Sequence, residues 1–387
     1  MSEFLFVCLG VFLTSLFWWS KAPVPFEVPK VIFFQWFVRI LTLVFGASFL
    51  IRRRIWRVNL KLLTPVLIFV VWATTVSLFG SNIPKSFTGN YFRIDGLITL
   101  YELVGFSVLV SYFWKEKFKK MISLTFFASS TLLSLLAIAE ILTHRFGLGS
   151  AATFGNPVFL AGYLAVAIPF IFYLFKSTGR KIYLILLIVQ VLATILIGAI
   201  SSILTLVVFA VIYLIFLQKK VVKLILIPLL VGASFLTVLS WSTYHFYLKN
   251  PKTLVAEGRE RIYQSVVRGV LKRPILGYGW ANVDYAFETG IWPMKFYHDV
   301  YVDKAHSEIL EILVTTGIPG LLIYLYFLYM FLKQLIIKYR KSTGKLWNFT
   351  LVSIILLYLF HSQTNVISIA EEIIFWLVLG VTLSASR

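Results

Sequence analysis

Apolar runs of about 20 residues recur along the chain, with short polar connections between them. A helix of that length crosses a hydrocarbon layer of about 30 Å. The runs lack the alternation of apolar and polar residues that strands of a membrane β-barrel show. The pattern therefore predicts an all-α polytopic membrane protein with about twelve transmembrane helices. The predicted spans are 4–20, 31–51, 62–80, 95–113, 121–142, 157–175, 182–200, 203–217, 224–242, 312–334, 347–364 and 371–385.

The longest polar interruption divides the chain into three parts. Residues 1–242 hold nine predicted spans, residues 243–311 form a large loop, and residues 312–387 hold the last three spans. Between Glu257 and Leu322 lie eight of the sixteen Asp and Glu residues, together with a dense run of Lys and Arg. We therefore expect most of the chemistry in and beside this loop.

Within the loop, residues 254–272 are predicted to form an amphipathic helix. Ile262, Val266 and Val270 recur at helical spacing, while basic residues fall on another face. Pro274 ends the helix, and the GYG that follows is typical of a turn. Residues 280–304 then mix aromatic and acidic side chains. This mixture suits sugar faces and hydroxyls, and it equally suits a membrane–water interface.

The composition agrees with a membrane protein. The chain is 59% hydrophobic and 13% charged, whereas a soluble domain carries about 25% charged residues. The first apolar run has no basic segment before it, so we expect a retained helix rather than a cleaved signal peptide. The formal net charge of +20 indicates orientation in a membrane rather than a nucleic-acid partner, because Lys and Arg are retained on the cytoplasmic side.

The basic residues are concentrated in one alternate set of connections. These loops hold twenty Lys and Arg and one acidic residue: RRRIWRVNLK, WKEKFKK, KSTGRK, QKKVVK and KQLIIKYRKSTGK. By the positive-inside rule this set is cytoplasmic, which places both termini inside and the 243–311 loop outside. An enzyme outside the cytoplasmic membrane has no ATP or nucleotide-sugar pool, so it needs an already activated donor, such as a lipid-linked one. The alternative is that the loop only covers one face of a transporter.

His306 is the candidate general base. It lies where the loop re-enters the membrane at the start of a helix, and a neutral imidazole accepts a proton near pH 7. Asp303, expected one helical turn earlier, is placed to orient the ring. The alternative is a helix-start histidine whose ring only satisfies backbone groups.

Arginines are the candidate phosphate ligands, because a planar guanidinium donates two parallel hydrogen bonds and keeps its charge. Arg259 lies in the amphipathic helix, and Arg93, in SFTGNYFRIDG, lies at a membrane boundary. For any one arginine alone, a solvated surface residue is the simpler interpretation. Glu371 and Glu372 open the last span. They are candidates to bind an acceptor or to pair with one of the arginines, and we favour the simpler interpretation that they mark the membrane boundary.

Other kinds of site have little support in the sequence. No cluster of Cys and His has the spacing of zinc ligands. No P-loop, no Gly-rich dinucleotide motif and no Asp-x-Asp pair occurs. The sequence therefore predicts no metal site and no cofactor.

The order of several motifs resembles the O-antigen ligase family, which also includes O-antigen polymerases and protein O-oligosaccharyltransferases. The motifs are RERIY from Arg259, PILGYG from Pro274 and HSEILEILVTTGIPG from His306. Upstream, SFTGNYFRIDGLITL and TFGNPVFLAGYLA are similar to segments of bacterial members. The resemblance spans residues 85–322.

The chain departs from the family pattern at two places. Ser307 stands where the family usually has Asn after the histidine. Ile203 follows Ser201 and Ser202, where the family often has a Ser-Arg pair in a short outer turn. The second departure removes an expected pyrophosphate contact, and the candidates to supply that charge are Arg93, Arg145 and Arg268.

The resemblance implies an inverting, metal-independent membrane glycosyltransferase with a GT-C-like helical fold. The donor would be a glycan on undecaprenyl pyrophosphate, used in the bacterial cytoplasmic (inner) membrane at a site that faces the periplasm. His306 would take the proton of the acceptor hydroxyl, and Arg259 would stabilise negative charge on the pyrophosphate. The residues expected to bind the pyrophosphate or the glycan are Arg93, Arg145, Arg261, Arg268, Asp303 and Glu308.

The identity of the acceptor stays open at this point. An O-antigen ligase acting on lipid A–core is favoured, while a polymerase or a protein O-oligosaccharyltransferase would use the same donor. A transporter of lipid-linked glycans would also have about twelve spans, yet transporters more often show inverted repeats, and no such symmetry is visible. The expected partners are the lipid-linked donor, a lipid A–core or other glycan acceptor and membrane lipids, without nucleic acid.

Overall fold

The computed structural model describes residues 2–52, 56, 58–143, 150–217, 259–291, 302–342 and 344–384. Within these ranges the regular structure is helical, and one isolated bridge pairs Val58 with Ser384. The predicted span 224–242 and Arg145 lie outside the described residues. The α-helices are α1 Ser2–Leu16, α2 Glu27–Arg52, α3 Leu60–Leu78, α4 Ile83–Thr88, α5 Leu97–Phe113, α6 Lys119–Leu142, α7 Pro157–Thr178, α8 Lys181–Ile197, α9 Ile200–Leu217, α11 Arg259–Lys272, α12 Val283–Ile291, α13 Glu308–Lys341, α14 Lys345–Ser362 and α15 Ile369–Leu383.

Six helices among the described residues are long and apolar enough to cross a membrane: α2, α3, α6, α7, α13 and α14. Helices α1, α5, α8 and α9 are apolar and shorter. The prediction of an all-helical, multi-pass membrane protein is therefore confirmed, whereas the count of twelve spans stays a prediction.

The boundary between α8 and α9 lies earlier than predicted. Gly198 ends α8 with a φ of 78°, the left-handed conformation that glycine adopts without steric cost. Ser201 and Ser202, which were expected to separate the two spans, instead lie in the first turn of α9.

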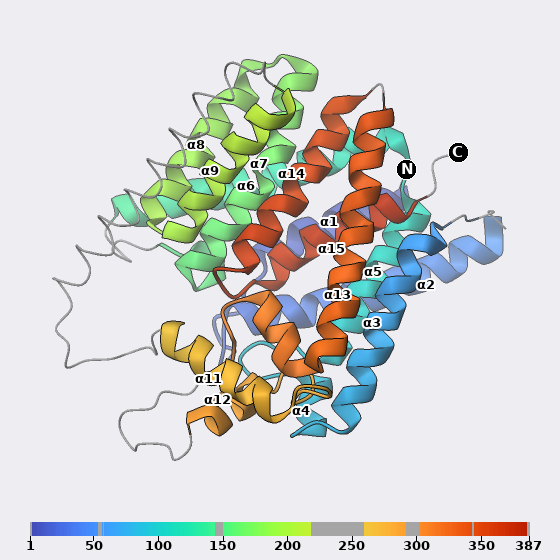
Figure 1. The fold of residues 1–387 in the computed structure, drawn as a ribbon. Helices are drawn as coiled ribbons and strands as arrows, with labels where there is room; N and C mark the ends of the chain where they lie inside the picture. The colour runs from blue at the N-terminus through green and yellow to red at the C-terminus, as the bar shows by residue number, and fades with distance from the viewer. Residues whose placement is uncertain are drawn as a thin grey trace.

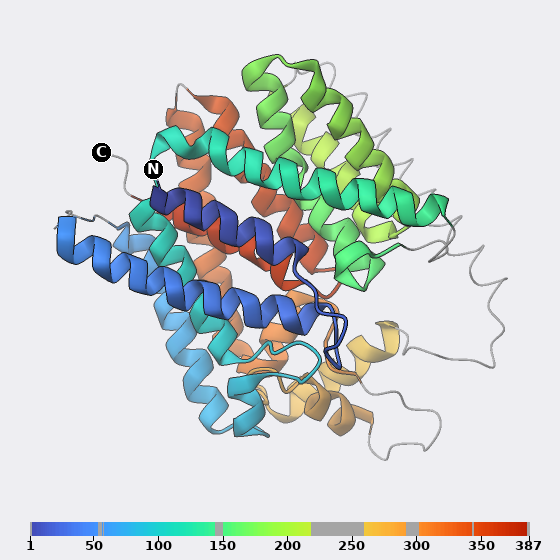
Figure 2. The same ribbon diagram turned by 180° about the vertical axis from the view of Figure 1, so that it is seen from behind.

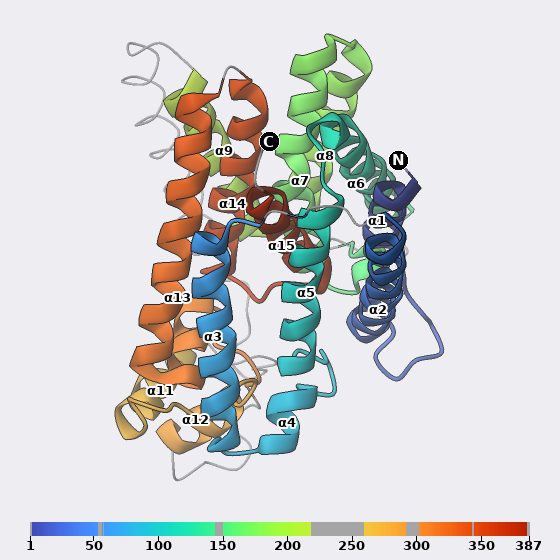
Figure 3. The ribbon, with the colours of Figure 1, turned by 90° about the vertical axis from the view of Figure 1, so that its right-hand side faces the viewer.

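Helix α7 is the most buried of the candidate spans. Helix α7 packs against α6, α8, α9, α14 and α15 (Figure 1). Its sequence is apolar on every side, as expected of a helix enclosed by other helices. Helix α13 packs along α3, and α15 along α5 (Figure 3). Helices α1, α2 and α6 cover the opposite side (Figure 2).

Helices α4, α11 and α12 lie together at one end of the bundle, away from the two termini (Figure 1). Ile262, Val266 and Val270 of α11 are buried in a small core shared with α12 and with Val314 of α13. Arg268, on the opposite face of α11, is exposed. The predicted amphipathic helix is thus confirmed for its described part, and its apolar face packs on protein.

Helix α13 is broken at Gly317, where φ is 71° and ψ is −178°. Pro319 follows and has no N–H to donate. The carbonyls of Val314 and Thr315 therefore lack the helical donors that residues 318 and 319 would ordinarily provide.

The PILGYG turn replaces those missing donors. The backbone N–H groups of Tyr278 and Gly279 donate to the carbonyls of Val314 and Thr315 at 3.0 Å and 2.9 Å. Ile318 N in turn donates to Pro274 O at 2.8 Å. An unsatisfied buried carbonyl would cost about 1–3 kcal/mol, so the turn and the broken helix depend on each other. Two of the sequence motifs therefore form a single structural unit beside the 302–307 segment.

Replacing Gly317 with Ala tests this unit. The new Cβ would lie 2.0 Å from the carbonyl oxygen of Ile275, and φ is positive. We expect Gly317→Ala to lower the free energy of unfolding by about 1–3 kcal/mol, measured as a lower melting temperature in detergent. The matched control is Gly105→Ala in α5, where a Cβ would meet no atom within 4 Å. Equal melting temperatures for the two variants would contradict the account.

Candidate active site

His306 lies in the non-helical segment 302–307 that precedes α13. Its φ of 52° is unusual for a residue with a side chain. Tyr263 of α11 donates its hydroxyl hydrogen to the carbonyl of His306 at 3.3 Å, and Ala305 beside it is fully buried. Strained backbone held in this way is common at functional sites.

The surroundings of His306 keep its ring neutral. Burial lowers the pKa of His306 below its ordinary value of 6.5, and the positive charge of Arg259 lowers it further. Arg93 and Lys304 act in the same direction, while Asp303 opposes them. A half-buried imidazole that is neutral at pH 7 is able to accept a proton.

Arg259 is brought to the same place from the start of α11. Its side chain is exposed, and its Nη2 donates to Oδ1 of Asn365 at 2.9 Å. Asn365 belongs to the turn between α14 and α15. Three segments far apart in the sequence therefore meet at His306: the start of α11, the 302–307 segment and the α14–α15 turn.

Arg93 reaches the 302–307 segment from the loop between α4 and α5. Its Nε donates to Oδ2 of Asp303 at 2.7 Å, and its guanidinium lies over the Phe159 ring. Burial would lower the pKa of Arg93, but the charge and hydrogen bond of Asp303, together with the charges of Asp95 and Glu27, raise it. A guanidinium has five N–H donors, so the contact through Nε does not exhaust its capacity to bind an anion.

Asp303 was expected to orient His306 from one helical turn away. The segment is not helical there, and the carboxylate of Asp303 is engaged with Arg93. Asp303 still lies close enough for its charge to act on the imidazole.

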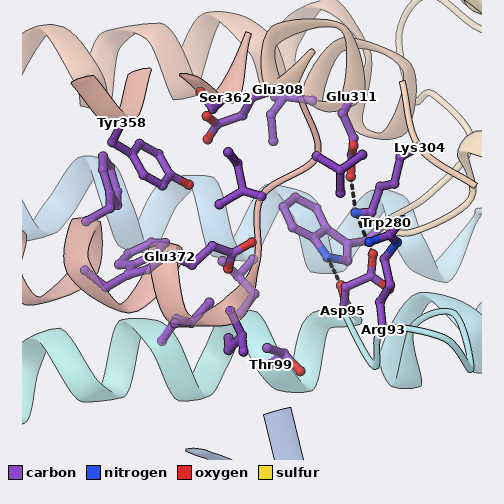
Figure 4. A pocket seen from close by; sticks show the side chains of 18 of the residues that line it. Arg93, Asp95, Thr99, Trp280, Lys304, Glu308, Glu311, Tyr358, Ser362 and Glu372 are labelled. Carbon is purple, nitrogen blue, oxygen red and sulfur yellow. Dashed lines mark hydrogen bonds and ion pairs between the residues drawn. The ribbon is translucent and has the colours of Figure 1, made fainter. Parts of the chain in front are cut away.

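Lys304 forms a second set of ion pairs on the other side of the segment. Its Nζ lies 2.5 Å from Oδ2 of Asp95 and also contacts Glu311 of α13 (Figure 4). Burial would raise the pKa of Asp95, but Lys304, together with the backbone N–H of Asn90 and the charge of Arg93, lowers it. Burial would also lower the pKa of Lys304, and the two carboxylates raise it instead. Trp280 donates its indole N–H to the Asp95 carbonyl at 2.9 Å, which holds the same loop.

A cavity of about 130 Å³ opens beside these ion pairs (Figure 4). Much of its lining is apolar, and we call it the polar cavity for the charged side chains that also line it. Lys304 and Glu308, which lie on either side of His306 in the sequence, both line it. Its other acidic and aromatic lining includes Glu27, Asp95, Glu311, Glu372, Trp280, Tyr324 and Tyr358. Carboxylates and aromatic rings of this kind can accept hydrogen bonds from sugar hydroxyls and pack on sugar faces.

A second, more aromatic pocket of about 410 Å³ shares Glu27 and Arg93 with the polar cavity. Asp303 lines it, together with Phe26, Phe92, Phe154 and Phe159. A charged arginine therefore lies where a polar and an aromatic space meet.

The remaining predicted residues are less central. Arg261 is half-buried on α11, and Arg268 is exposed on that helix. Arg268 lies nine residues beyond Arg259, which is about 13 Å along a helix axis. Like His306 and Arg259, neither residue lines the two pockets described above, and neither is among the charges that act on His306.

The sequence predicted no role in the site for His361 and Asn365, and it favoured a boundary role for Glu371 and Glu372. Glu371, interpreted as a membrane-boundary marker, is fully buried and lies 2.8 Å from Nδ1 of His361, so that interpretation is wrong. Glu372 lines the polar cavity. The available signal was the spacing of His361 and Asn365, four residues apart at the end of an apolar helix, since polar residues there are costly and often functional.

No group of three or more His, Cys, Asp or Glu side chains among the described residues is arranged to hold a metal ion.

Part of the chain matches a model of a known protein family. Residues 183–325 match the family model described as O-antigen ligase. The match includes α8, α9, α11, α12 and the first part of α13, and therefore Arg259 and His306. No curated protein matches the chain. The match agrees with the order of motifs in the sequence and supports membership of the O-antigen ligase family.

Proposed function

We propose that this protein transfers a glycan from undecaprenyl pyrophosphate to an acceptor hydroxyl at the outer face of a bacterial cytoplasmic membrane. Membership of the O-antigen ligase family supports a glycosyltransferase-type activity. The observation that carries the proposal is the pairing of a neutral His306 with the cationic Arg259, whose partner Asn365 lines the polar cavity. The concentration of Lys and Arg in the opposite set of loops supports the periplasmic side for the site.

The two residues divide the chemistry between them. His306 accepts the proton of the acceptor hydroxyl as its oxygen forms a bond to the anomeric carbon. The bond from that carbon to the phosphate oxygen breaks on the opposite face, and its electron pair leaves with the pyrophosphate. Arg259 stabilises the charge that develops there. A single displacement inverts the anomeric configuration, and these steps use no metal ion.

The polar cavity and the aromatic pocket suit the two parts of the donor. Carboxylates and Trp280 in the cavity offer acceptors and a ring face to a glycan. The aromatic pocket, with Arg93 at the junction, offers an apolar surface next to a cation, which suits a lipid phosphate. We propose lipid A–core as the acceptor, so that the protein is an O-antigen ligase. A polymerase would instead elongate the donor-linked glycan.

Replacing His306 with Ala is the direct test of the base. Purified protein receives undecaprenyl-pyrophosphate glycan and lipid A–core in the presence of EDTA. We expect His306→Ala to lower the transfer rate by about 10²- to 10⁴-fold, the usual contribution of a general base, while donor binding persists. The control is Arg180→Lys, an exposed residue between α7 and α8. Transfer at the wild-type rate in His306→Ala would remove this residue as the base.

The pH dependence follows from the lowered pKa of His306. Only the neutral imidazole accepts a proton, so kcat/KM should fall on acidification as the ring becomes protonated. Because the pKa lies below 6.5, the midpoint of the acidic limb should lie below pH 6.5 in a pH–rate profile of transfer. A midpoint above that value would show that His306 is not held neutral by Arg259 and by burial.

A further inference from the structure

We propose that Asn365 is a positioning residue for Arg259 and that buried His361 and Glu371 fix the orientation of its amide. The inference rests on the proposed role of Arg259 in transfer. It extends the site to α14 and α15, which lie outside the residues that match the family model.

Four polar side chains form a chain of contacts from Arg259 into the protein interior. Arg259 Nη2 donates to Asn365 Oδ1 at 2.9 Å. Asn365 Nδ2 lies 3.2 Å from His361 Nε2, and His361 Nδ1 lies 2.8 Å from Glu371 Oε1. Asn365 is 5% exposed, and His361 and Glu371 are fully buried.

The Glu371 carboxylate determines the direction of every bond in this chain. A carboxylate only accepts, so His361 donates from Nδ1 and accepts at Nε2. Asn365 must therefore turn its NH₂ group toward His361, where Thr364 Oγ1 takes a second amide hydrogen at 3.2 Å. The amide oxygen is left facing Arg259. The opposite tautomer of His361 would turn the NH₂ group of Asn365 toward the guanidinium and repel it.

The space around His361 and Glu371 is shaped to hold these two polar side chains. A Cβ on Gly162 of α7 would lie 2.2 Å from Cε1 of His361 and 2.8 Å from Oε2 of Glu371. Glycine at this position thus leaves room for the pair inside the bundle. Within the described residues, Glu371 Oε2 has no hydrogen-bond partner. A buried polar pair is often no more stabilising than well-packed apolar side chains, so stability alone does not account for this arrangement.

The same turn also contacts the segment that carries His306. Oε1 of Gln363 accepts hydrogen bonds from Oγ of Ser307 at 3.1 Å and from N of Ile309 at 3.2 Å. These contacts satisfy the start of α13, whose first N–H groups have no partner within the helix. The 363–365 turn therefore holds Arg259 on one side and the residue after His306 on the other.

The α8–α9 region adds to this arrangement. Ser202 Oγ lies 3.5 Å from Nε2 of His361. Ile203 follows it in the position where the family often has arginine. In this chain the α8–α9 region contacts the buried histidine through Ser202. Arg259, which Asn365 positions, supplies one of the positive charges at the site.

A double-mutant cycle tests the inference. Asn365→Ala, His361→Gln and His361→Leu are each made alone and combined with Arg259→Ala, and kcat and KM for the donor are measured. Asn365→Ala should lower kcat by about 10- to 100-fold, because a misplaced catalytic group costs up to about that much, with little change in KM. In the Arg259→Ala background the same substitution should cost less than about twofold, because both act through one interaction.

Comparing His361→Gln with His361→Leu separates a loss of positioning of Asn365 from a general loss of stability. Gln at position 361 can donate to Glu371 and accept from Asn365, so His361→Gln should keep kcat within about threefold of the wild type. His361→Leu removes both bonds and should resemble Asn365→Ala. If His361→Leu does not purify, because Glu371 has lost its donor, then Asn365→Ala carries the test. The control is Ser353→Ala, a fully buried serine on the same helix, which should keep full activity.

Equal losses from Asn365→Ala in both backgrounds, or no difference from Ser353→Ala, would overturn the inference. Wild-type turnover in the same assay tests the proposed function separately. If the wild type binds the donor without turnover, the affinity for inorganic pyrophosphate is measured for the same set of single and double variants. Asn365→Ala should then weaken binding when Arg259 is present and not when it is absent, and equal effects in the two backgrounds would overturn the inference.

Discussion

The ion pairs of Asp303 and Lys304, three and two residues before His306, are the interactions on which the site depends. Arg93 pairs with Asp303, and Asp95 and Glu311 pair with Lys304, so two residues of the 302–307 segment are tied to the helical bundle. These side chains are mostly buried, with exposed fractions between 13% and 23%. Removing one partner from such a pair leaves an uncompensated charge and costs about 3–5 kcal/mol. The pairs therefore fix where the segment lies, whether or not they add net stability.

The backbone at this end of the bundle is fixed by a second constraint. Helix α13 is interrupted at Gly317, and the PILGYG turn satisfies the carbonyls that the interruption leaves. Trp72 of α3 also donates its indole N–H to the Thr316 carbonyl at 2.9 Å. Irregular backbone at membrane depth requires partners from the protein, and here a turn and a neighbouring helix provide them. The start of α13 is thereby anchored, and His306 lies immediately before it.

Much of the fold could be predicted from the sequence, because apolar runs and helical periodicity reflect local physics. The spans now seen as α2, α3, α7 and α14, and the amphipathic α11, are examples. His306 and Arg259 could be chosen from motifs, and the structure brings them together. The partner of Arg259 could not be predicted, because Asn365 lies 106 residues away and nothing local marks the contact.

The surroundings of Glu371 and Glu372 also could not be predicted from the sequence. Glu371 and Glu372 stand at the start of a span, where a charged pair ordinarily meets water. Whether such a residue faces solvent, a cavity or another side chain depends on which helices pack around it. Helices α7 and α14 enclose Glu371, whereas Glu372 faces the cavity. No local pattern in the sequence determines that packing.

The central claim is that His306 and Arg259 transfer a glycan from a lipid pyrophosphate. The most direct test is mass spectrometry of the products formed by purified wild-type protein, undecaprenyl-pyrophosphate glycan and EDTA, with and without lipid A–core. The account predicts glycosylated lipid A–core and released undecaprenyl pyrophosphate only when the acceptor is present. A lengthened glycan on the donor lipid without acceptor would make the protein a polymerase. An intact donor that stays bound without any product would contradict the account and favour a transporter.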